Sequence, residues 1–441
     1  IADTDVVNNY TELKNALNNG GDIRLGSDIQ FAFRDPALKI NPGITVNLDL
    51  NGHKISSSQD TYAIENRGKL NIDGNGFISS RGIKNFGLFC LKSGEIRALA
   101  PDAGAAVWND GGKFTMLGGK LIAEAVPDQH KDVSVPFASV SSNSVANILG
   151  GSLISDYVNI YVEKGHVTVK NISLNVNKPG FFAARVGPDG IKSMGAQKET
   201  INMQNVTINA EAGSGGVFAG GGTINLVDCT IKQSGNVDYQ SSAIAASTNG
   251  VVNVFGGNYS SDGYGAYIFT SGGTINFNSN DNLKIENYHN VQGYKINLDS
   301  NEKRTIIDGN FDSRGILLRA STDSSAAIVP SVINFKTIDK PDFAGEYDMC
   351  TLAIPYNGLS GYVGEIIDIS DLNKLVKNFD KFPSSTTIEL ASQEKQKKTV
   401  DVSKKVITVS NNDSENEIKL IVKTTDGVCE GEQEVLVKVK K

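Results

Sequence analysis

The sequence predicts a β-solenoid, in which short strands stack coil upon coil, followed by a smaller β-rich region. The first observation is a repeat, because residues 217–231, 244–259 and 267–280 share small or apolar residues, a Gly and an apolar–Asn–apolar triplet. The Gly falls at positions 222, 250 and 273, which gives periods of 28 and 23 residues. The second observation is that each unit offers only very short strands, with almost no helical periodicity.

The apolar–Asn–apolar triplet indicates how each strand is oriented. Its two apolar residues alternate with Asn, so they lie on one face of the strand and Asn lies on the other. Stacked coils should align the apolar residues into interior ladders and Asn into an outer surface ladder of hydrogen-bonded amides. The preceding Gly is expected to supply backbone angles that a side chain would resist. The triplets are residues 46–48, 70–72, 146–148, 201–203, 224–226, 252–254, 275–277 and 296–298.

A short helix is predicted ahead of the first coil, from Asn9 to Gly20. Thr11 can cap its start and Gly20 can end it. Its apolar face comprises Leu13, Ala16 and Leu17. The open end of a solenoid exposes a hydrophobic interior, so we expect this helix to cover that end. Residues 22–29 are then predicted to form the first edge strand.

Two long insertions interrupt the regular coils, at residues 123–139 and 177–199. Insertions in a solenoid map to loops, often on one binding face, so we predict the site between them. Arg185 and Lys192 are the candidates to hold an acidic sugar or to act as a catalytic base. Three aspartates are candidate calcium ligands: Asp128, Asp132 and Asp189. We therefore expect either no cofactor or calcium.

Four further residues are candidates for the site or for a structural role. His130, in the first insertion, is a candidate catalytic residue, and Tyr239, in a smaller insertion, is a candidate ligand-binding residue. Trp108 is the single Trp, and it either fills the interior or stacks on a sugar ring. His53 follows an Asn-Gly turn, and we interpret it as a turn residue instead of a general base.

The chain changes character after residue 335. The solenoid is expected to span residues 1–335, and residues 336–441 to form an α+β or immunoglobulin-like domain. Ser370 or Asp371 can begin a helix in this second domain. Three alternating segments follow and are predicted as antiparallel strands: residues 401–410, 417–423 and 434–440.

Composition restricts the classes of partner. A formal net charge of −7 argues against general nucleic-acid binding, and an anionic polysaccharide would need a local basic patch or a bridging cation. No apolar segment is long enough to span a membrane, so no membrane insertion is expected. The four cysteines match no metal-binding spacing. Cys350 and Cys429 can pair, whereas Cys229 is interpreted as a buried apolar residue.

The repeating units, together with the stretch Val-Asn-Leu-Asp-Leu-Asn-Gly-His-Lys-Ile at residues 46–55, resemble the pectate-lyase-like right-handed parallel β-helix superfamily. The resemblance covers residues 1–335. It implies a right-handed parallel β-helix in an extracellular bacterial protein, secreted or attached to the cell surface. The superfamily contains lyases, hydrolases, epimerases, phage tailspikes and adhesins, so the resemblance is specific for architecture and not for activity.

The catalytic motifs that the resemblance implies are absent. The lyase pattern Arg-x-Pro-x-x-Arg does not occur, and neither does an Asp-Asp pair of the kind that superfamily hydrolases use. The sequence therefore favours a cell-surface adhesin or carbohydrate-binding protein whose partner is a polysaccharide or a host surface glycan or protein. The alternative is a polysaccharide lyase or glycoside hydrolase that acts on an acidic polysaccharide, and whether the chain is an enzyme stays open.

Overall fold

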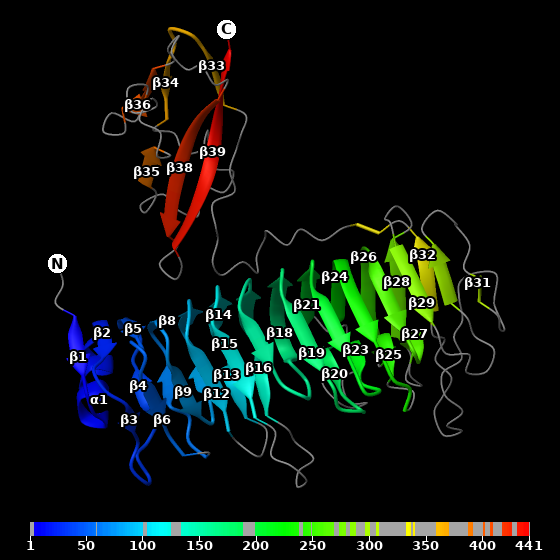
Figure 1. The fold of residues 1–441 in the computed structure, drawn as a ribbon, viewed down its shortest axis with the longest axis horizontal. Coiled ribbons are helices and arrows are strands. Elements are labelled where there is room, and N and C mark those ends of the chain that lie inside the picture. The colour runs from blue at the N-terminus through cyan, green and yellow to red at the C-terminus, as the bar shows by residue number, and fades with distance from the viewer. Residues whose placement is uncertain are drawn as a thin grey trace. The chain divides into compact units, whose positions relative to one another are not determined.

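In the computed structural model, the chain divides into two compact units, residues 1–349 and 350–441. The first unit is a β-solenoid of parallel strands, and the second is a small mixed β unit (Figure 1). The structure describes residues 4–58, 60–99, 104–124, 134–187, 199–237, 241–247, 249–268, 273–278, 283–287, 296–299, 306–307, 332–336, 338–339, 359–369, 387–390, 400–401, 406–408, 417–425 and 430–440.

Each coil of the solenoid contributes to three stacks of parallel strands, which confirms the predicted parallel β-helix. Stack 1 contains β4 (Leu38–Ile40), β7 (Ile64–Asn66), β10 (Ile83–Asn85), β13 (Ala105–Asn109), the starts of β16 (Val135–Ile148) and β18 (Ile160–Lys170), β20 (Phe182–Val186), β23 (Gly215–Gly220), β25 (Ser242–Ser247) and β27 (Tyr264–Ile268).

Stack 2 follows stack 1 within each coil. It contains β1 (Asp5–Val7), β2 (Gly21–Leu25), β5 (Thr45–Asp49), β8 (Lys69–Asp73), β11 (Leu88–Leu91), β14 (Lys113–Met116), the ends of β16 and β18, β21 (Thr200–Gln204), the starts of β24 (Thr223–Gln233) and β26 (Gly250–Ser261), β28 (Gly273–Asn278) and β32 (Val332–Lys336).

Stack 3 completes each coil and runs in two parts. The first part contains β3 (Ile29–Gln30), β6 (Lys54–Ser56), β9 (Phe77–Ser80), β12 (Glu95–Ala98), β15 (Lys120–Ala123) and β17 (Ser152–Ile154). The second part contains β19 (Ser173–Val176), β22 (Thr207–Ala210), the ends of β24 and β26, and β29 (Leu283–Asn287).

The apolar residues of the triplets form the interior, as predicted. Val46 pairs in register with Leu70, and Leu48 with Ile72, and all four side chains are buried. Further along the interior, the rings of Phe89 and Phe114 in stack 2 and of Phe137 in stack 1 follow one another, with centroids 5.1 and 5.5 Å apart. Aligned apolar side chains thus give each coil a share of one continuous core.

The Gly ahead of each triplet is needed for a different reason from the predicted one. Among these positions Gly165 has a positive φ, of 100°, whereas Gly68 and Gly250 do not. A Cβ atom at Gly68 would instead lie 2.3 Å from the carbonyl oxygen of Ile44, and one at Gly250 would lie 2.1 Å from that of Ala219. The backbones of successive coils approach so closely at this bend that there is no room for a side chain.

One predicted triplet lies outside the column. Residues 296–298 belong to β30 (Ile296–Asp299), which pairs antiparallel with β29 and with β31 (Ile306–Ile307). The next place in the column is taken by Ile333-Asn334-Phe335 of β32, in register with Ile275-Asn276-Phe277. A triplet alone therefore does not fix a coil position, because an excursion of the chain between coils can carry the same pattern.

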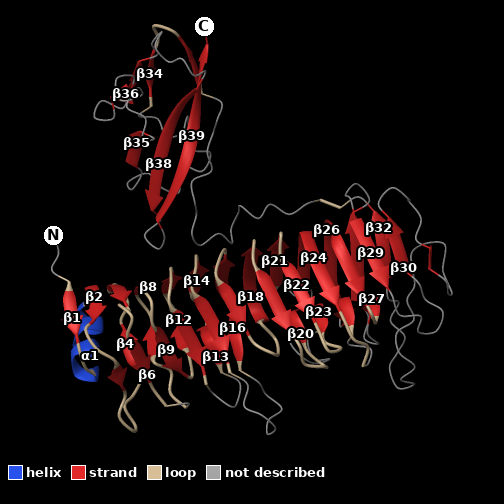
Figure 2. Cartoon of the chain, viewed as in Figure 1, coloured by secondary structure: helices blue, strands red, loops and turns tan. Residues whose placement is uncertain are grey.

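The N-terminal helix α1 (Tyr10–Asn19) is present as predicted, at the N-terminal end of the solenoid (blue in Figure 2). Its cap is Asn9 and not Thr11, because the Asn9 side-chain oxygen accepts the backbone N–H of Glu12 at 2.9 Å. The Glu12 carboxylate in turn accepts the N–H of Asn8 at 2.7 Å, a reciprocal capping arrangement. The predicted face of Leu13, Ala16 and Leu17 is buried in the solenoid core.

Two asparagine ladders run along the solenoid. The inner ladder, which the sequence analysis missed, comprises Asn66, Asn85 and Asn109 at the bend between stacks 1 and 2, all fully buried. The Asn66 amide donates to the Asn85 oxygen, and the Asn85 amide to the Asn109 oxygen, both at 2.9 Å. Its sequence signal is Asn-x-Gly, repeated at all three positions.

The outer ladder is the predicted column of triplet Asn residues on the outward face of stack 2. Its amides are hydrogen-bonded across coils, for example Asn71 to Asn47 at 2.8 Å and Asn225 to Asn202 at 2.8 Å. The prediction that the whole column is exposed is wrong. Asn47 is exposed, but Asn225 is buried, and so are the middle positions, which are Cys90, Thr115, Asn147 and Thr168.

Part of the cover over the outer face is visible near the C-terminal coils. Val227 and Phe255 point outward from stack 2 and are buried, and Ile338 packs against them. The N–H of Ile338 donates to the side-chain oxygen of Asn278 at 3.3 Å. The chain therefore returns over the outward face of stack 2 just after β32.

Cys229 is buried in the interior, as predicted. Burial raises the pKa of its thiol to about 11, which keeps the thiol protonated and unreactive at neutral pH. Cys350 and Cys429, the predicted disulfide pair, lie outside the described residues.

The second unit contains two small sheets. One has the strand order β33 (Ser360–Tyr362), β39 (Glu430–Lys440), β38 (Glu417–Thr425), β35 (Thr387–Leu390), and the other β34 (Ile366–Asp368), β37 (Val406–Thr408), β36 (Val400–Asp401). β38 and β39 form a long antiparallel pair whose inward residues are buried. The predicted helix at Ser370 or Asp371 lies outside the described residues. None of the described helices is long and apolar enough to cross a membrane.

Candidate functional site

Stack 1 carries a column of outward side chains that is rich in aromatic rings and cations. In chain order it is Lys39, Glu65, Lys84, Trp108, Ala138, Tyr161, Arg185, Phe218 and Ala245. Tyr161 faces outward because its neighbours Ile160 and Val162 are buried in the core. We call Trp108, Tyr161, Arg185 and Phe218 the aromatic stripe. Figure 1 shows its strands, β13, β16, β18, β20 and β23, side by side.

The rings of the stripe are anchored on the solenoid and only partly exposed. Trp108 and Tyr161 are half-buried and pack on a small apolar cluster that includes Ala105 and Ala138. Ala138 lies between them in register, so two large rings flank a small residue on consecutive coils. Since neighbouring strands are about 4.8 Å apart, Trp108 and Arg185 are about 14 Å apart along the column. The spacing allows one extended ligand to touch all three aromatic or cationic side chains.

Arg185 joins the aromatic rings electrostatically. Its guanidinium carbon lies 5.2 Å from the centre of the Phe218 ring, and the Phe218 ring stacks on Phe182 at the same centroid distance of 5.2 Å. Burial lowers the pKa of the Arg185 guanidinium, while the nearby Tyr161 phenol acts in the opposite direction. A cation held on a ring in this way is partly desolvated and fixed in direction.

The stripe continues toward the N-terminal coils as a cluster of cations on rings. The Arg67 guanidinium carbon lies 4.0 Å from the centre of the Phe86 ring, and the Lys84 amine lies 5.1 Å from the same centre. Arg81 lies 5.5 Å from the ring of Tyr62. Burial raises the pKa of the Tyr62 phenol, so it stays neutral and available as a hydrogen-bond donor.

The charge of this surface is opposite to that of the whole chain. Along the column, Lys39, Lys84 and Arg185 stand against the single carboxylate of Glu65. The chain as a whole has a formal net charge of −7. A local basic column with partly exposed rings can attract an anion and pack on an apolar face of the same ligand.

The structure brings together two of the predicted site residues and moves one of them. Trp108 and Arg185 belong to one column, although they are far apart in sequence. Arg185 was expected in the second insertion, but it lies on strand β20, because the flanking Ala184 and Val186 alternate with it and enter the core. Phe218 was not singled out, and its signal was the same alternation of buried and outward residues.

The other predicted site residues lie outside the described residues. These are Lys192, His130, Tyr239, Asp128, Asp132 and Asp189. Within the part of the chain that the structure describes, no three or more His, Cys, Asp or Glu side chains are grouped so that they could hold a metal ion.

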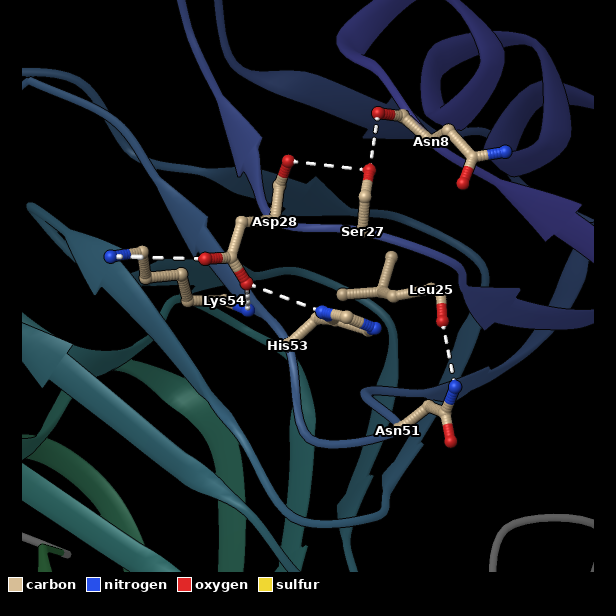
Figure 3. Close-up of polar contacts among 7 residues, drawn as sticks. All are labelled: Asn8, Leu25, Ser27, Asp28, Asn51, His53 and Lys54. Carbon is tan, nitrogen blue, oxygen red and sulfur yellow. Dashed lines mark hydrogen bonds and ion pairs between the residues drawn. The ribbon is translucent and has the colours of Figure 1, made fainter.

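His53 lies at the corner between stacks 2 and 3 of the first coils, where Figure 3 shows it beside Asp28 and Lys54. Its Nδ1 atom is 3.3 Å from one Asp28 carboxylate oxygen, which also accepts the Lys54 backbone N–H at 3.1 Å. The Lys54 N–H, more than the His53 ring, lowers the pKa of Asp28. The contacts join one corner to the next coil, which fits a turn residue.

No family model, curated protein or solved structure matches this chain. The β-solenoid architecture therefore stands on the strand register, and function must be argued from the site.

Proposed function

We propose that this chain is a carbohydrate-binding protein that acts outside the cell, as a secreted or surface-attached bacterial adhesin, and that the aromatic stripe is its glycan site. The observation that carries the proposal is the register of Trp108, Tyr161 and Arg185 on one outward column. The resemblance of the repeat units to the pectate-lyase-like superfamily, many members of which are secreted, supports the location.

The chemistry of the stripe favours an acidic glycan. A sugar ring has an apolar face that packs on an aromatic side chain, and its carboxylate or sulfate groups pair with cations. Trp108 and Tyr161 supply the ring faces, and Lys84 and Arg185 supply the charge at either end of them. The partner would be a bacterial polysaccharide, or a host surface glycan or the protein that carries it.

A polysaccharide lyase is the second candidate, and one observation favours it. Proton abstraction next to a carboxylate needs a base that is neutral part of the time. The lowered pKa of Arg185 moves that side chain in the required direction. A glycoside hydrolase is less well supported, because it needs two carboxylates across the bond, and Glu65 is the single carboxylate of the column.

The test is binding of a panel of polyuronates and sulfated glycans by calorimetry, with ultraviolet absorbance followed in parallel to detect unsaturated products, with and without calcium. Trp108→Ala should weaken binding by about tenfold, because an aromatic platform contributes about 1.4 kcal/mol. Arg185→Gln should weaken binding of acidic glycans and leave neutral ones unchanged. A calcium-dependent rise in absorbance that Arg185→Gln abolishes would establish the lyase instead.

The matched control is Phe33→Ala, since Phe33 is an aromatic residue 87% exposed on a loop outside the stripe. It should bind as the unmodified protein does. Melting temperatures of all variants identify losses that are due to misfolding. Equal affinity of the unmodified protein and Trp108→Ala, at equal stability, would rule out the stripe as the glycan site.

A further inference from the structure

A second hollow lies on stack 2, on a different face from the aromatic stripe. It has a volume of about 440 Å³, within the range of small-molecule sites. It extends over the outward faces of β2, β5 and β8, from Thr4 at one end to Lys92 at the other. We call it the polar groove. Its side chains are polar almost throughout: Thr4, Asp22, Arg24, Asn47, Asp49, Asn71, Asp73 and Lys92.

On one side the groove ends where the outer ladder becomes buried. Asn47 and Asn71 of the outer ladder form part of its floor, and Asn47 is exposed. In the same register column the next position, Cys90, is fully buried. On the other side Asp22 pairs with Asn47, and Thr4, just before β1, also lines the groove. The hollow therefore lies over the part of the outer face formed by β2, β5 and β8.

One row of the groove is a chain of amides ended by a carboxylate. Asn71 donates to the Asn47 oxygen at 2.8 Å, and Asn47 donates to Asp22 at 2.8 Å. Each primary amide has two N–H groups and two oxygen lone pairs, and these bonds use one of each at Asn47. The row thus holds its amides in fixed directions and still presents a donor and an acceptor per residue.

The second row consists of charged residues in register. Arg24, Asp49 and Asp73 follow one another on β2, β5 and β8. Arg24 binds one oxygen of Asp49 at 2.9 Å, and the other oxygen accepts the N–H of Asn51 at 2.9 Å. Like charges on adjacent strands repel each other. The proximity of the Asp49 and Asp73 carboxylates is therefore unfavourable, and neighbouring hydrogen bonds and ion pairs must offset it.

Hydrogen bonds to one carboxylate oxygen orient the Asp73 side chain, and its other oxygen is available to a ligand. That one oxygen accepts both the Ser93 hydroxyl, at 2.6 Å, and the Gly74 N–H, at 2.8 Å. Within the described part of the chain, the second oxygen has no hydrogen-bond partner, and the Lys92 amine has no ion-pair partner within 4.0 Å. The groove therefore offers a fixed acceptor and a mobile donor at one end.

We propose that the polar groove is a binding site for a neutral sugar unit, separate from the acidic-glycan site on stack 1. An anion would meet three carboxylates, and a simple cation would meet Arg24 and Lys92. Hydroxyl groups both donate and accept, so a polyol satisfies a surface that mixes carboxylates, amides and an amine. Two sites on different faces would let one chain hold an acidic and a neutral part of a mixed glycan.

The experiment measures binding of glucose, galactose and N-acetylglucosamine by ligand-observed nuclear magnetic resonance and calorimetry on the full chain. Asp73→Asn and Lys92→Gln should each weaken binding by about tenfold, because each removes a charged hydrogen bond. The matched controls, Asp228→Asn and Lys232→Gln, change exposed residues of β24 outside the groove and should have no effect.

Three outcomes would overturn the proposal: no binding of any neutral sugar at tens of millimolar, equal binding by the groove variants and their controls, or loss of neutral-sugar binding in Trp108→Ala. The last would assign the sugar to the stripe. The two sites are distinguished by salt, since added salt should weaken acidic-glycan binding and leave neutral-sugar binding nearly unchanged. Failure of the stripe proposal alone would not alter the result expected for Asp73→Asn.

Discussion

The two asparagine ladders use the same amide-to-amide bond in different surroundings. The inner ladder of Asn66, Asn85 and Asn109 is fully buried, and its amides also bond to backbone carbonyls of the next bend. The outer ladder lies on a sheet face that is exposed at Asn47 and buried at Thr168. Burial decides what each bond contributes, because a buried polar group cannot turn to water when its partner is removed.

One repeat can therefore hold an Asn that is needed for stability and another Asn that can be replaced with little loss of stability. Asn85 donates to the Asn109 oxygen and to the carbonyls of Gly87 and Lys113. The bend is closely packed around this amide, since a Cβ at Gly112 would lie 2.5 Å from the Asn85 amide nitrogen. At Asn71 the surroundings are partly open, and water can replace the amide.

The largest effect is expected for Asn85→Ala. It leaves the buried Asn109 amide oxygen without its Asn85 donor and takes the Asn85 acceptor from the buried Asn66 amide, and should lower the free energy of unfolding by about 3 kcal/mol. Urea denaturation followed by circular dichroism would measure this.

The control is Asn71→Ala on the outer ladder, which should change the free energy of unfolding by no more than about 0.5 kcal/mol. Equal losses for the two variants would contradict the distinction between the ladders.

A smaller effect, of opposite sign, is expected in the middle of the outer ladder. Thr168 is fully buried, and its hydroxyl has no hydrogen-bond partner among the residues that the structure describes. Thr168→Val replaces that hydroxyl by a methyl group of the same shape, so it should raise the free energy of unfolding by about 1 kcal/mol. A loss of stability would mean that the hydroxyl is satisfied after all, for example by a bound water.

The smallest effect concerns pH and compares the inner ladder with Asp73, a carboxylate on the same outward face of stack 2 as the outer ladder. The Ser93 hydroxyl, followed by the Gly74 N–H, lowers the pKa of Asp73. A carboxyl whose pKa is lowered on folding stabilises the protein above its unfolded pKa, and that stabilisation is lost as pH falls through the folded value.

Ser93→Ala should therefore lower the melting temperature slightly at neutral pH, and the difference should disappear in acid. The penalty of Asn85→Ala should not change over the same range, because amides do not titrate. Melting curves between neutral and acidic pH would show whether the two variants differ in this way.

Local patterns were enough to predict the solenoid and the N-terminal helix, because the alternation at Val46-Asn47-Leu48 and the apolar face of Leu13, Ala16 and Leu17 are local properties of the chain. The aromatic stripe was not predictable in the same way. The coils differ in length. The register that places Trp108, Tyr161 and Arg185 on one column is therefore known only when every strand has been assigned. The inner ladder could have been predicted from its Asn-x-Gly repeat. Its burial could not, because burial depends on how the bends of successive coils stack.

The first strand has a consequence for how copies of this chain behave at high concentration. β1 is three residues long, and among the described residues it pairs with β2 alone, leaving one edge of the sheet unpaired. An unpaired parallel edge is a template on which another copy can add and fibres can grow. Here the edge is short and carries Asp5, two features that hinder pairing with another copy.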